Sequence, residues 1–258
     1  MNVFKVTMLA SGSKGNSALI STGKQNFLVD MGISCKMLTS RLKEVGFTVD
    51  DLDGIFLTHE HIDHVKGLAT FTKKHTVPIY SSELTWRAIL SKEPKIERRN
   101  CRIIGGALKC GEVEINSFEI PHDAVDPHGY VFKCNGSKCA YITDTGFVTP
   151  AVRQAAEDAD TIILEANHDV EMLKNGIYPP HLKQRILSTR GHLSNESAGW
   201  LLAHLPRLPE NIILAHLSQE NNLPRLALDT VRNILDGASL FNEARIIVAA
   251  QDRIVKDY

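Results

Sequence analysis

The chain has 258 residues, 43% of them hydrophobic, and a net charge of −1 with histidine neutral. This apolar fraction is ordinary for a globular protein, and the length allows one large α/β domain or two small ones. No run of about 18 apolar residues occurs, which excludes a membrane-spanning helix. A net charge near zero excludes nucleic-acid binding through overall basicity, so any contact with a polyanion must be local.

The first residues and the cysteines bear on the cellular compartment. Residues 1–16 contain an apolar stretch of only about five residues and lack the pattern of a secretory signal. The cysteines are odd in number and show no CxxC spacing, which predicts reduced thiols: Cys35, Cys101, Cys110, Cys134 and Cys139. We therefore expect a cytoplasmic protein.

Short apolar strands and amphipathic helices are expected along the whole chain. The first part predicts strands at residues 3–9, 17–21, 27–30, 54–58 and 77–80, and helices at 36–45, 65–74 and 84–90. The middle predicts strands at 112–120, 130–134 and 139–143. The last part predicts helices at 150–157, 181–190, 196–205 and 223–235, and strands at 161–165, 211–215 and 245–248. A strand meander followed by crossovers in each half predicts an α/β fold with two sheets and helices outside, in one domain of residues 1–258.

Residues 58–64, Thr-His-Glu-His-Ile-Asp-His, carry the strongest chemical signal. A buried strand delivers His59 at its end, and His61 points the same way in extended backbone. Asp63 and His64 follow where the chain turns into a helix. Three imidazoles and a carboxylate this close together suit two divalent cations about 3.5–4 Å apart. A solvated histidine-rich turn is the alternative, but it does not explain four such groups after a buried strand.

A dinuclear site needs further ligands from the ends of other strands. Three residues meet this condition: His122 after the strand at 112–120, Asp144 after that at 139–143, and His216 after that at 211–215. Each residue alone is more often structural. Together with the histidine segment, they form a complete ligand set.

The order of these residues, beginning at Asp30, resembles the five-motif pattern of the metallo-β-lactamase superfamily. The resemblance implies a four-layer αββα sandwich with the site at one edge between the sheets. It also implies that one metal is bound by His59, His61 and His122, the other by Asp63, His64 and His216, and that Asp144 bridges both. Asp30 would orient the histidine loop without binding metal. The nucleophile would be a hydroxide shared by the two ions, with Asp63 orienting it and accepting its proton.

Two positions narrow the chemistry within the superfamily. His61 stands where the di-iron flavoproteins carry glutamate, which disfavours a redox role. Asp144 stands where several true β-lactamases carry cysteine. The function classes that remain within the superfamily are hydrolases of thioesters, lactones and phosphodiesters.

Two further segments resemble loops of the tRNA 3′-processing branch: residues 164–169, Leu-Glu-Ala-Asn-His-Asp, and residues 190–194, Arg-Gly-His-Leu-Ser. By that match, Glu165 orients His192 or keeps it charged, and His192 protonates the leaving oxygen as a general acid. Alternatively, Ser194 caps a helix and His192 is incidental. Capping explains Ser194 but not His192.

The loop at residues 11–17, Ser-Gly-Ser-Lys-Gly-Asn-Ser, is a weaker signal. Its backbone, hydroxyls, amide and lysine suit a phosphate group, although a tight turn explains it equally well. The expected substrate contacts are Ser11, Ser13, Lys14, Asn16 and His168. Together with the two segments above, this loop resembles the bacterial YycJ family, also called WalJ or VicX. The resemblance implies a dinuclear-metal phosphodiesterase that acts on DNA as a 5′→3′ exonuclease.

Several basic residues are candidates for contacts along a DNA strand, although most of them suit ordinary solvated faces. They are Lys73, Lys74, Arg87, Lys95, Arg98, Arg99, Arg102, Lys183, Arg185 and Arg190.

Two alternatives stay open. One is another hydrolase of this fold, acting on a small cyclic phosphodiester, a lactone or a thioester. The pair of Glu165 and His192 argues against thioesters, because a thiolate leaves with little acid help. The other is a non-catalytic regulatory module, which a complete ligand set disfavours. Histidine-rich ligation suits zinc, the carboxylates also admit manganese or iron, and no organic cofactor is expected.

Overall fold

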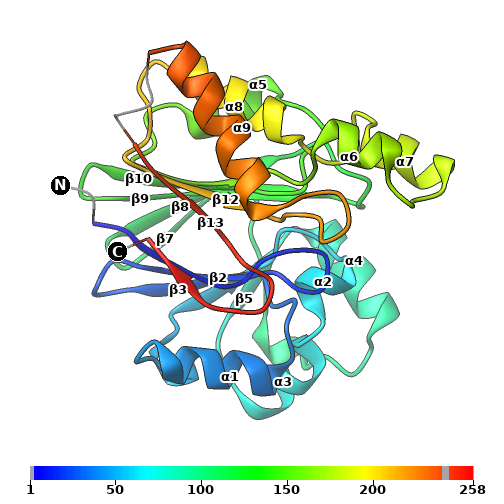
Figure 1. The fold of residues 1–258 in the computed structure, drawn as a ribbon. Coiled ribbons are helices and arrows are strands. Elements are labelled where there is room, and N and C mark those ends of the chain that lie inside the picture. The colour runs from blue at the N-terminus through cyan, green and yellow to red at the C-terminus, as the bar shows by residue number, and fades with distance from the viewer. Residues whose placement is uncertain (1–2, 240–243, 258) are drawn as a thin grey trace.

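Two seven-stranded sheets pack face to face in the computed structural model, which describes residues 3–239 and 244–257 (Figure 1). In the first sheet the order is β14-β1-β2-β3-β4-β5-β6, and in the second it is β13-β12-β11-β10-β9-β8-β7. Each sheet combines an antiparallel meander with a parallel part, which is β3 to β6 in the first and β10 to β13 in the second.

The strands of the first sheet are β1 (Lys5–Ala10), β2 (Ser17–Ser21), β3 (Asn26–Val29), β4 (Gly54–Phe56), β5 (Ile79–Ser81), β6 (Cys101–Ile103) and β14 (Val255–Lys256). Those of the second sheet are β7 (Ala107–Cys110), β8 (Val113–Glu119), β9 (His128–Cys134), β10 (Ser137–Ile142), β11 (Thr161–Glu165), β12 (Asn211–Ala215) and β13 (Arg245–Val248). The helices are α1 (Cys35–Glu44), α2 (Ile62–Val65), α3 (Leu68–Lys74), α4 (Glu83–Lys92), α5 (Pro150–Ala156), α6 (Val170–Asn175), α7 (Pro180–Ile186), α8 (Asn195–Ala203) and α9 (Pro224–Gly237). Short 3₁₀ helices lie at Val49–Asp51 and Arg98–Asn100.

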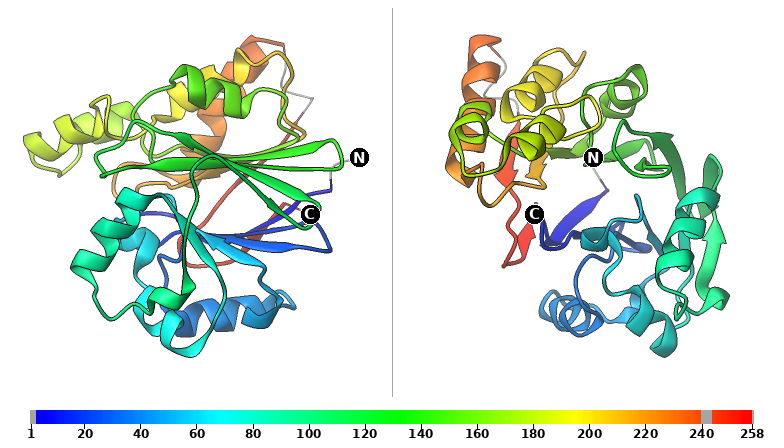
Figure 2. Two further views of the ribbon diagram at one scale, coloured as in Figure 1. Left: turned by 180° about the vertical axis from the view of Figure 1, so that it is seen from behind. Right: turned by 90° about the vertical axis from the view of Figure 1, so that its right-hand side faces the viewer.

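Three buried apolar clusters correspond to the three interfaces between layers. Leu38 of α1 and Phe71 of α3 pack beneath the first sheet, and Val231 of α9 packs with α5 and α8 above the second. Between the sheets, the rings of Phe27 and Phe132 stack with centroids 5.8 Å apart. Figures 1 and 2 show the resulting order of helices, sheet, sheet and helices. The expected αββα sandwich is confirmed.

Two expected helices are corrected by backbone contacts. The helix predicted at 65–74 is divided into α2 and α3, because the Gly67 amide donates to the Met31 carbonyl outside the helix. The helix predicted at 181–190 ends at Ile186, because the backbone amide of His192 donates a hydrogen bond to the Ile186 carbonyl. Helix α6 and strands β6, β7 and β14 were not predicted.

The chain ends in the first sheet after leaving the second. Strand β14 pairs antiparallel with β1, and the amide of Val6 donates to the Asp257 carboxylate over 2.8 Å. Among the described residues, no helix combines the length and the apolar character needed to cross a bilayer.

Candidate active site

The predicted site residues meet at one edge of the sandwich, where parallel strands of both sheets end. Asp30 follows β3, Asp144 follows β10, Glu165 ends β11 and His216 follows β12. Asp30, Asp144 and His216 have φ values of 61°, 57° and 56°. Residues other than glycine rarely adopt this left-handed conformation, and such strain concentrates at functional sites. The chain thus turns sharply after three strands at the edge where the side chains collect.

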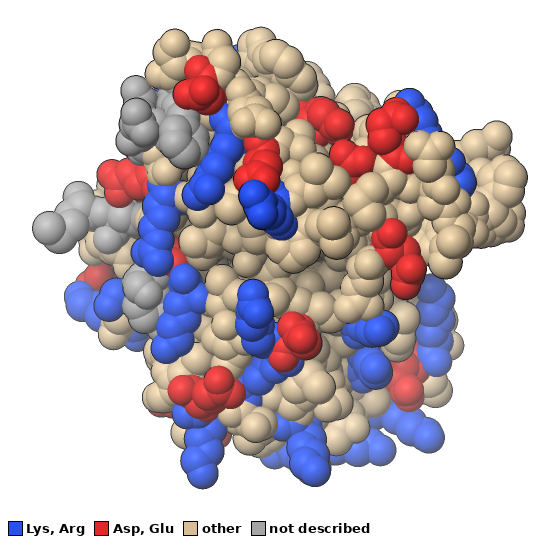
Figure 3. Space-filling model, in the orientation of Figure 1, with Lys and Arg blue, Asp and Glu red and all other residues tan. Residues whose placement is uncertain are grey.

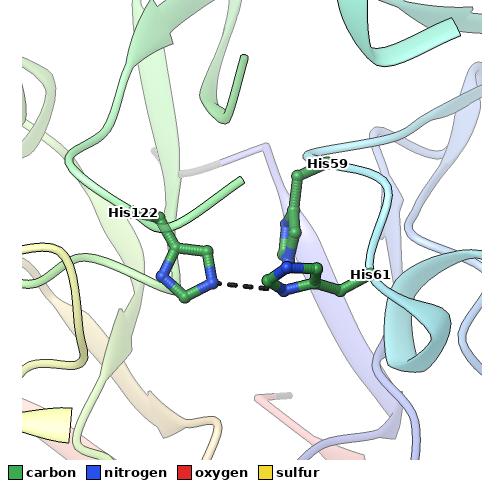
Figure 4. A group of neighbouring side chains, drawn as sticks. All are labelled: His59, His61 and His122. Carbon is green, nitrogen blue, oxygen red and sulfur yellow. Dashed lines mark hydrogen bonds between the residues drawn. The ribbon is translucent and has the colours of Figure 1, made fainter. Parts of the chain in front are cut away.

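One group of three histidines joins the two sheets. His59 and His61 lie on the loop after β4, and His122 faces them from the loop after β8 (Figure 4). The Nε2 atom of His122 is 3.4 Å from Nδ1 of His61. One ligand atom from each residue fits within 4.8 Å of the other two. The Nδ1 atom of His122 lies 3.1 Å from the Gly191 carbonyl, a contact that leaves Nε2 free to face the group.

A second group contains Asp63, His64 and His216, whose ligand atoms also lie within 4.8 Å of one another. The Asp63 Oδ2 atom is 3.3 Å from His64 Nε2 and 3.5 Å from His216 Nε2. Asp144 lies between the two groups, with Oδ2 3.4 Å from His64 Nε2 and Oδ1 3.8 Å from His122 Nε2. The carboxylate of Asp144 therefore approaches residues of both groups.

Asp30 supports the histidine loop from beneath. Its Oδ2 atom lies 2.8 Å from Nδ1 of His64, and its Oδ1 atom accepts the backbone amide of Thr58 over 2.9 Å. The Thr58 hydroxyl also lies 2.9 Å from Nδ1 of His59. Because Asp30 is fully buried and contacts the rear nitrogen of His64, it is placed to orient the ring.

Glu165 contacts four donors with its two carboxylate oxygens. Oε2 accepts the backbone amides of Thr145 and Leu193, each over 2.9 Å. Oε1 lies 2.9 Å from Nδ1 of His192 and 2.8 Å from Nδ1 of His216. The contact with His192 was expected, whereas the contact with His216 was not. One buried oxygen therefore orients both a candidate metal ligand and the candidate general acid.

The charges in the site favour cations. Burial lowers the pKa of His59 and of His122, which keeps both rings neutral as metal ligation requires. Burial opposes the charged form of His64 and His216 as well, but nearby carboxylates outweigh it. Asp30 raises the pKa of His64 well above its usual range, and Asp144 helps to raise that of His216 to about 10. The negative potential of these carboxylates, which raises both pKa values, also attracts metal cations.

Orphaned atoms in the same place also fit divalent ions. The buried atoms His59 Nε2, His216 Nε2 and Asp144 Oδ2 have no hydrogen-bond partner. A buried polar atom without a partner is costly, and imidazole nitrogen and carboxylate oxygen are ordinary ligands of zinc and manganese. The residues present thus fit two divalent cations.

A cleft of about 250 Å³ opens over these groups. His61, Asp63, His122, Asp144 and His216 form its polar floor. Its other lining residues are Ser13, Asn167, Tyr178, Leu182, Arg185, Ile186, His192 and Ser218.

The five expected substrate contacts are placed differently from one another. Ser13 lines the cleft, and Lys14 is exposed on the same loop. Ser11 is buried, and its hydroxyl accepts the His216 amide over 2.7 Å. The buried Asn16 amide nitrogen lies 3.2 Å from His64 Nε2. His168 is buried outside the lining, and burial lowers its pKa to about 4. Ser11 and Asn16 thus contact candidate ligands directly.

Of the basic candidates, Arg185 lines the cleft, and Arg190 lies beside it, with Nε 3.3 Å from the His122 carbonyl. Lysine and arginine are spread over the face in Figure 3, with acidic residues among them. This distribution agrees with local rather than overall attraction of a polyanion.

Sequence reasoning missed the contributions of Thr58, Glu60 and Tyr178. Both carboxylate oxygens of the buried Glu60 approach the Val125 amide, at 3.1 and 3.3 Å, so this side chain ties the histidine loop to the loop after His122. Thr58 and Glu60 stand within the histidine motif, which was a usable signal. Tyr178 carries no signal of its own, because only the fold brings it to the cleft.

Two sheets between helix layers, with a His/Asp cluster at their common edge, define a protein of the metallo-β-lactamase type. Residues 25–217 match the family described as the beta-lactamase superfamily domain. The chain is 42% identical over 242 residues to exodeoxyribonuclease WalJ of Streptococcus pneumoniae serotype 2, covering 92% of this chain and 90% of WalJ. It is 39% identical over 233 residues to exodeoxyribonuclease YycJ of Bacillus anthracis, covering 89% and 88%. The solved metallo-β-lactamase-fold protein YhfI of Bacillus subtilis has a TM-score of 0.72 at 18% identity, over 98% of both chains. The chain therefore belongs to the metallo-β-lactamase superfamily and, within it, to the family that contains WalJ and YycJ.

Proposed function

We propose that this protein is a metal-dependent phosphodiesterase that degrades DNA as an exonuclease, with 5′→3′ polarity. The observation that carries the proposal is the pair of His192 and Glu165 at the wall of a cleft floored by a His/Asp cluster. A phosphodiester needs both electrostatic stabilisation of its oxygens and a proton for its leaving alkoxide, and this cleft brings the required groups together. The names of the relatives, exodeoxyribonucleases WalJ and YycJ, support DNA as the substrate.

His59, His61 and His122 would hold one divalent cation, and Asp63, His64 and His216 the other, with Asp144 between them. When bound, two such ions lower the pKa of water from 15.7 toward about 7 and neutralise phosphoryl oxygens. Zinc suits the histidine ligands, and manganese and iron suit the carboxylates. Metal analysis of protein purified without chelators, followed by reconstitution, identifies the ion.

The chain's own residues supply the proton chemistry. The pKa of Asp63 lies well below its usual range, since neighbouring His64 and His216 outweigh the effect of burial. Asp63 thus stays a carboxylate that can accept a hydrogen bond from the attacking water and orient it. When His192 is protonated, Glu165 holds its Nδ1–H and the other ring nitrogen can donate its proton to the departing sugar oxygen.

The substrate is tested with reconstituted protein on four substrates: 5′-phosphorylated duplex DNA, single-stranded DNA, RNA and a cyclic nucleotide. We expect stepwise shortening of DNA from the 5′ end. Hydrolysis of the cyclic nucleotide alone would favour the small-molecule phosphodiesterase instead. No hydrolysis with zinc, manganese or iron would favour the non-catalytic module.

The free cysteines support a cytoplasmic location, because all five are unpaired in the structure.

A further inference from the structure

The segment formed by α6 and α7, residues 170–186, projects from the second sheet's helix layer (Figure 1). Its inner side contributes Tyr178, Leu182, Arg185 and Ile186 to the lining. These four residues, called the wall below, add an aromatic ring, two aliphatic side chains and a guanidinium to a cleft that histidines and carboxylates also line.

We propose that this wall is a nucleotide subsite, in which Tyr178 stacks on a base next to the scissile phosphate and Arg185 contacts the following phosphate. This inference rests on the proposed function and names the part of the DNA that the cleft recognises. An aromatic ring beside a phosphate-binding floor is the arrangement that proteins use for single-stranded nucleic acid. Every base has a π-face, so a tyrosine platform accepts any sequence, as repeated removal of nucleotides requires.

The structure favours a nucleotide over a purely apolar ligand because of Arg185. Its guanidinium pairs with Asp123, whose Oδ1 atom lies 3.3 Å from Nε2 of His122. Arg185 is thus linked through Asp123 to the candidate metal ligand His122, which places its positive charge next to the phosphate that would be cleaved. Within the segment, Lys183 Nζ donates to the Lys174 carbonyl over 2.7 Å and links α7 to α6.

The base contact is tested with single-stranded DNA that carries an abasic tetrahydrofuran residue on either side of the cleaved bond. Removing the base at one of these two positions, the one that Tyr178 contacts, should lower kcat/KM of the wild-type protein about tenfold. Tyr178→Ala should show the same loss on intact DNA and no further loss on that abasic DNA, whereas Tyr178→Phe should retain wild-type rates. Trp200→Ala, at an aromatic side chain on α8 that is 54% exposed and outside the lining, is the matched control.

A binding measurement gives a second readout without turnover. In metal-free protein, 2-aminopurine at the same position should be quenched by the wild-type chain and by Tyr178→Phe but not by Tyr178→Ala. Arg185→Ala should weaken binding of intact and abasic DNA equally, and should lower the slope of log affinity against log salt by about 0.7. Arg225→Ala, on α9 and outside the lining, should leave the slope unchanged.

The results separate the two proposals. Equal losses of Tyr178→Ala on intact and abasic DNA, or an unchanged salt slope in Arg185→Ala, would overturn the subsite while leaving the exonuclease intact. Failure of the metal-loaded wild-type protein to cleave any DNA would overturn the exonuclease, and the subsite with it.

Discussion

Glu165→Gln changes the charge and hydrogen bonding at a single buried carboxylate. In the native protein, Oε2 is committed to two backbone amides and Oε1 to Nδ1 of both His192 and His216. Backbone amides can only donate, so the glutamine carbonyl must replace Oε2. The side-chain NH₂ group then faces two imidazole nitrogens, which must become acceptors. Each ring carries its proton on Nε2 instead, and His216 can no longer present a lone pair to a metal.

The magnitude follows from these changes. Loss of a carboxylate partner that orients a ligating histidine costs about 10- to 100-fold in metal affinity. Hydrogen bonds to a charged group contribute about 1.5–3 kcal/mol and neutral ones about 0.5–1.5 kcal/mol. The glutamine keeps the same hydrogen-bond partners but is neutral, so we expect the free energy of unfolding to fall by about 1–3 kcal/mol. At saturating metal, His192 without a carboxylate partner for its charged form should still lower kcat on DNA about 100-fold or more.

Chelator competition measures metal affinity, urea unfolding measures stability, and labelled DNA measures the rate. Glu112→Gln is the matched control, since Glu112 forms an exposed surface pair with Lys24, and solvent screens such pairs so that they contribute little to stability. If Glu165→Gln bound metal as tightly as the wild-type protein and lost only rate on DNA, Glu165 would act on His192 alone. The shared-oxygen argument would then be refuted.

Three further predictions concern separate features. His192→Ala should lower the rate on DNA about 10²- to 10⁴-fold but spare a diester with a nitrophenol leaving group, which needs no proton; equal losses on both would remove its acid role. Gly32→Ala should lower the free energy of unfolding of the metal-free protein in urea by about 1–3 kcal/mol, because the added Cβ would lie 1.6 Å from the Asp63 carbonyl oxygen. The control is Gly105→Ala, whose added Cβ meets no atom within 4 Å and whose free energy of unfolding should stay within about 0.5 kcal/mol of the wild-type value. Burial raises the pKa of Asp257 to about 6, so its contribution to stability is present below about pH 4 and is lost as the pH rises through 6. In Asp257→Asn, the free energy of unfolding measured in urea should therefore vary less between pH 4 and 7, and it should be about 1 kcal/mol higher than in the wild-type protein at pH 7 after allowance for solvent screening. An unchanged dependence on pH would contradict the raised pKa of Asp257.

The candidate site was largely predictable because its residues occupy strand ends. Apolar strands are recognisable from local composition, and a histidine or aspartate directly after one is conspicuous. His122, Asp144 and His216 were selected on this ground, and the structure brings all three to the histidine loop. The substrate contacts were less predictable, since a loop sequence does not show which side chains turn inward. Ser11 and Asn16 are buried in contact with candidate ligands, whereas Ser13 faces the cleft.

The amino-acid sequence by itself determined the αββα architecture and the candidate ligands, because alternating apolar segments and strand-end residues are local properties of the chain. Only the tertiary structure decided that Glu165 serves both His192 and His216, and that Tyr178 and Arg185 wall the cleft. These relations join segments distant along the chain, and they arise from the packing of two sheets and the path of α6 and α7. No local pattern of residues encodes such distances.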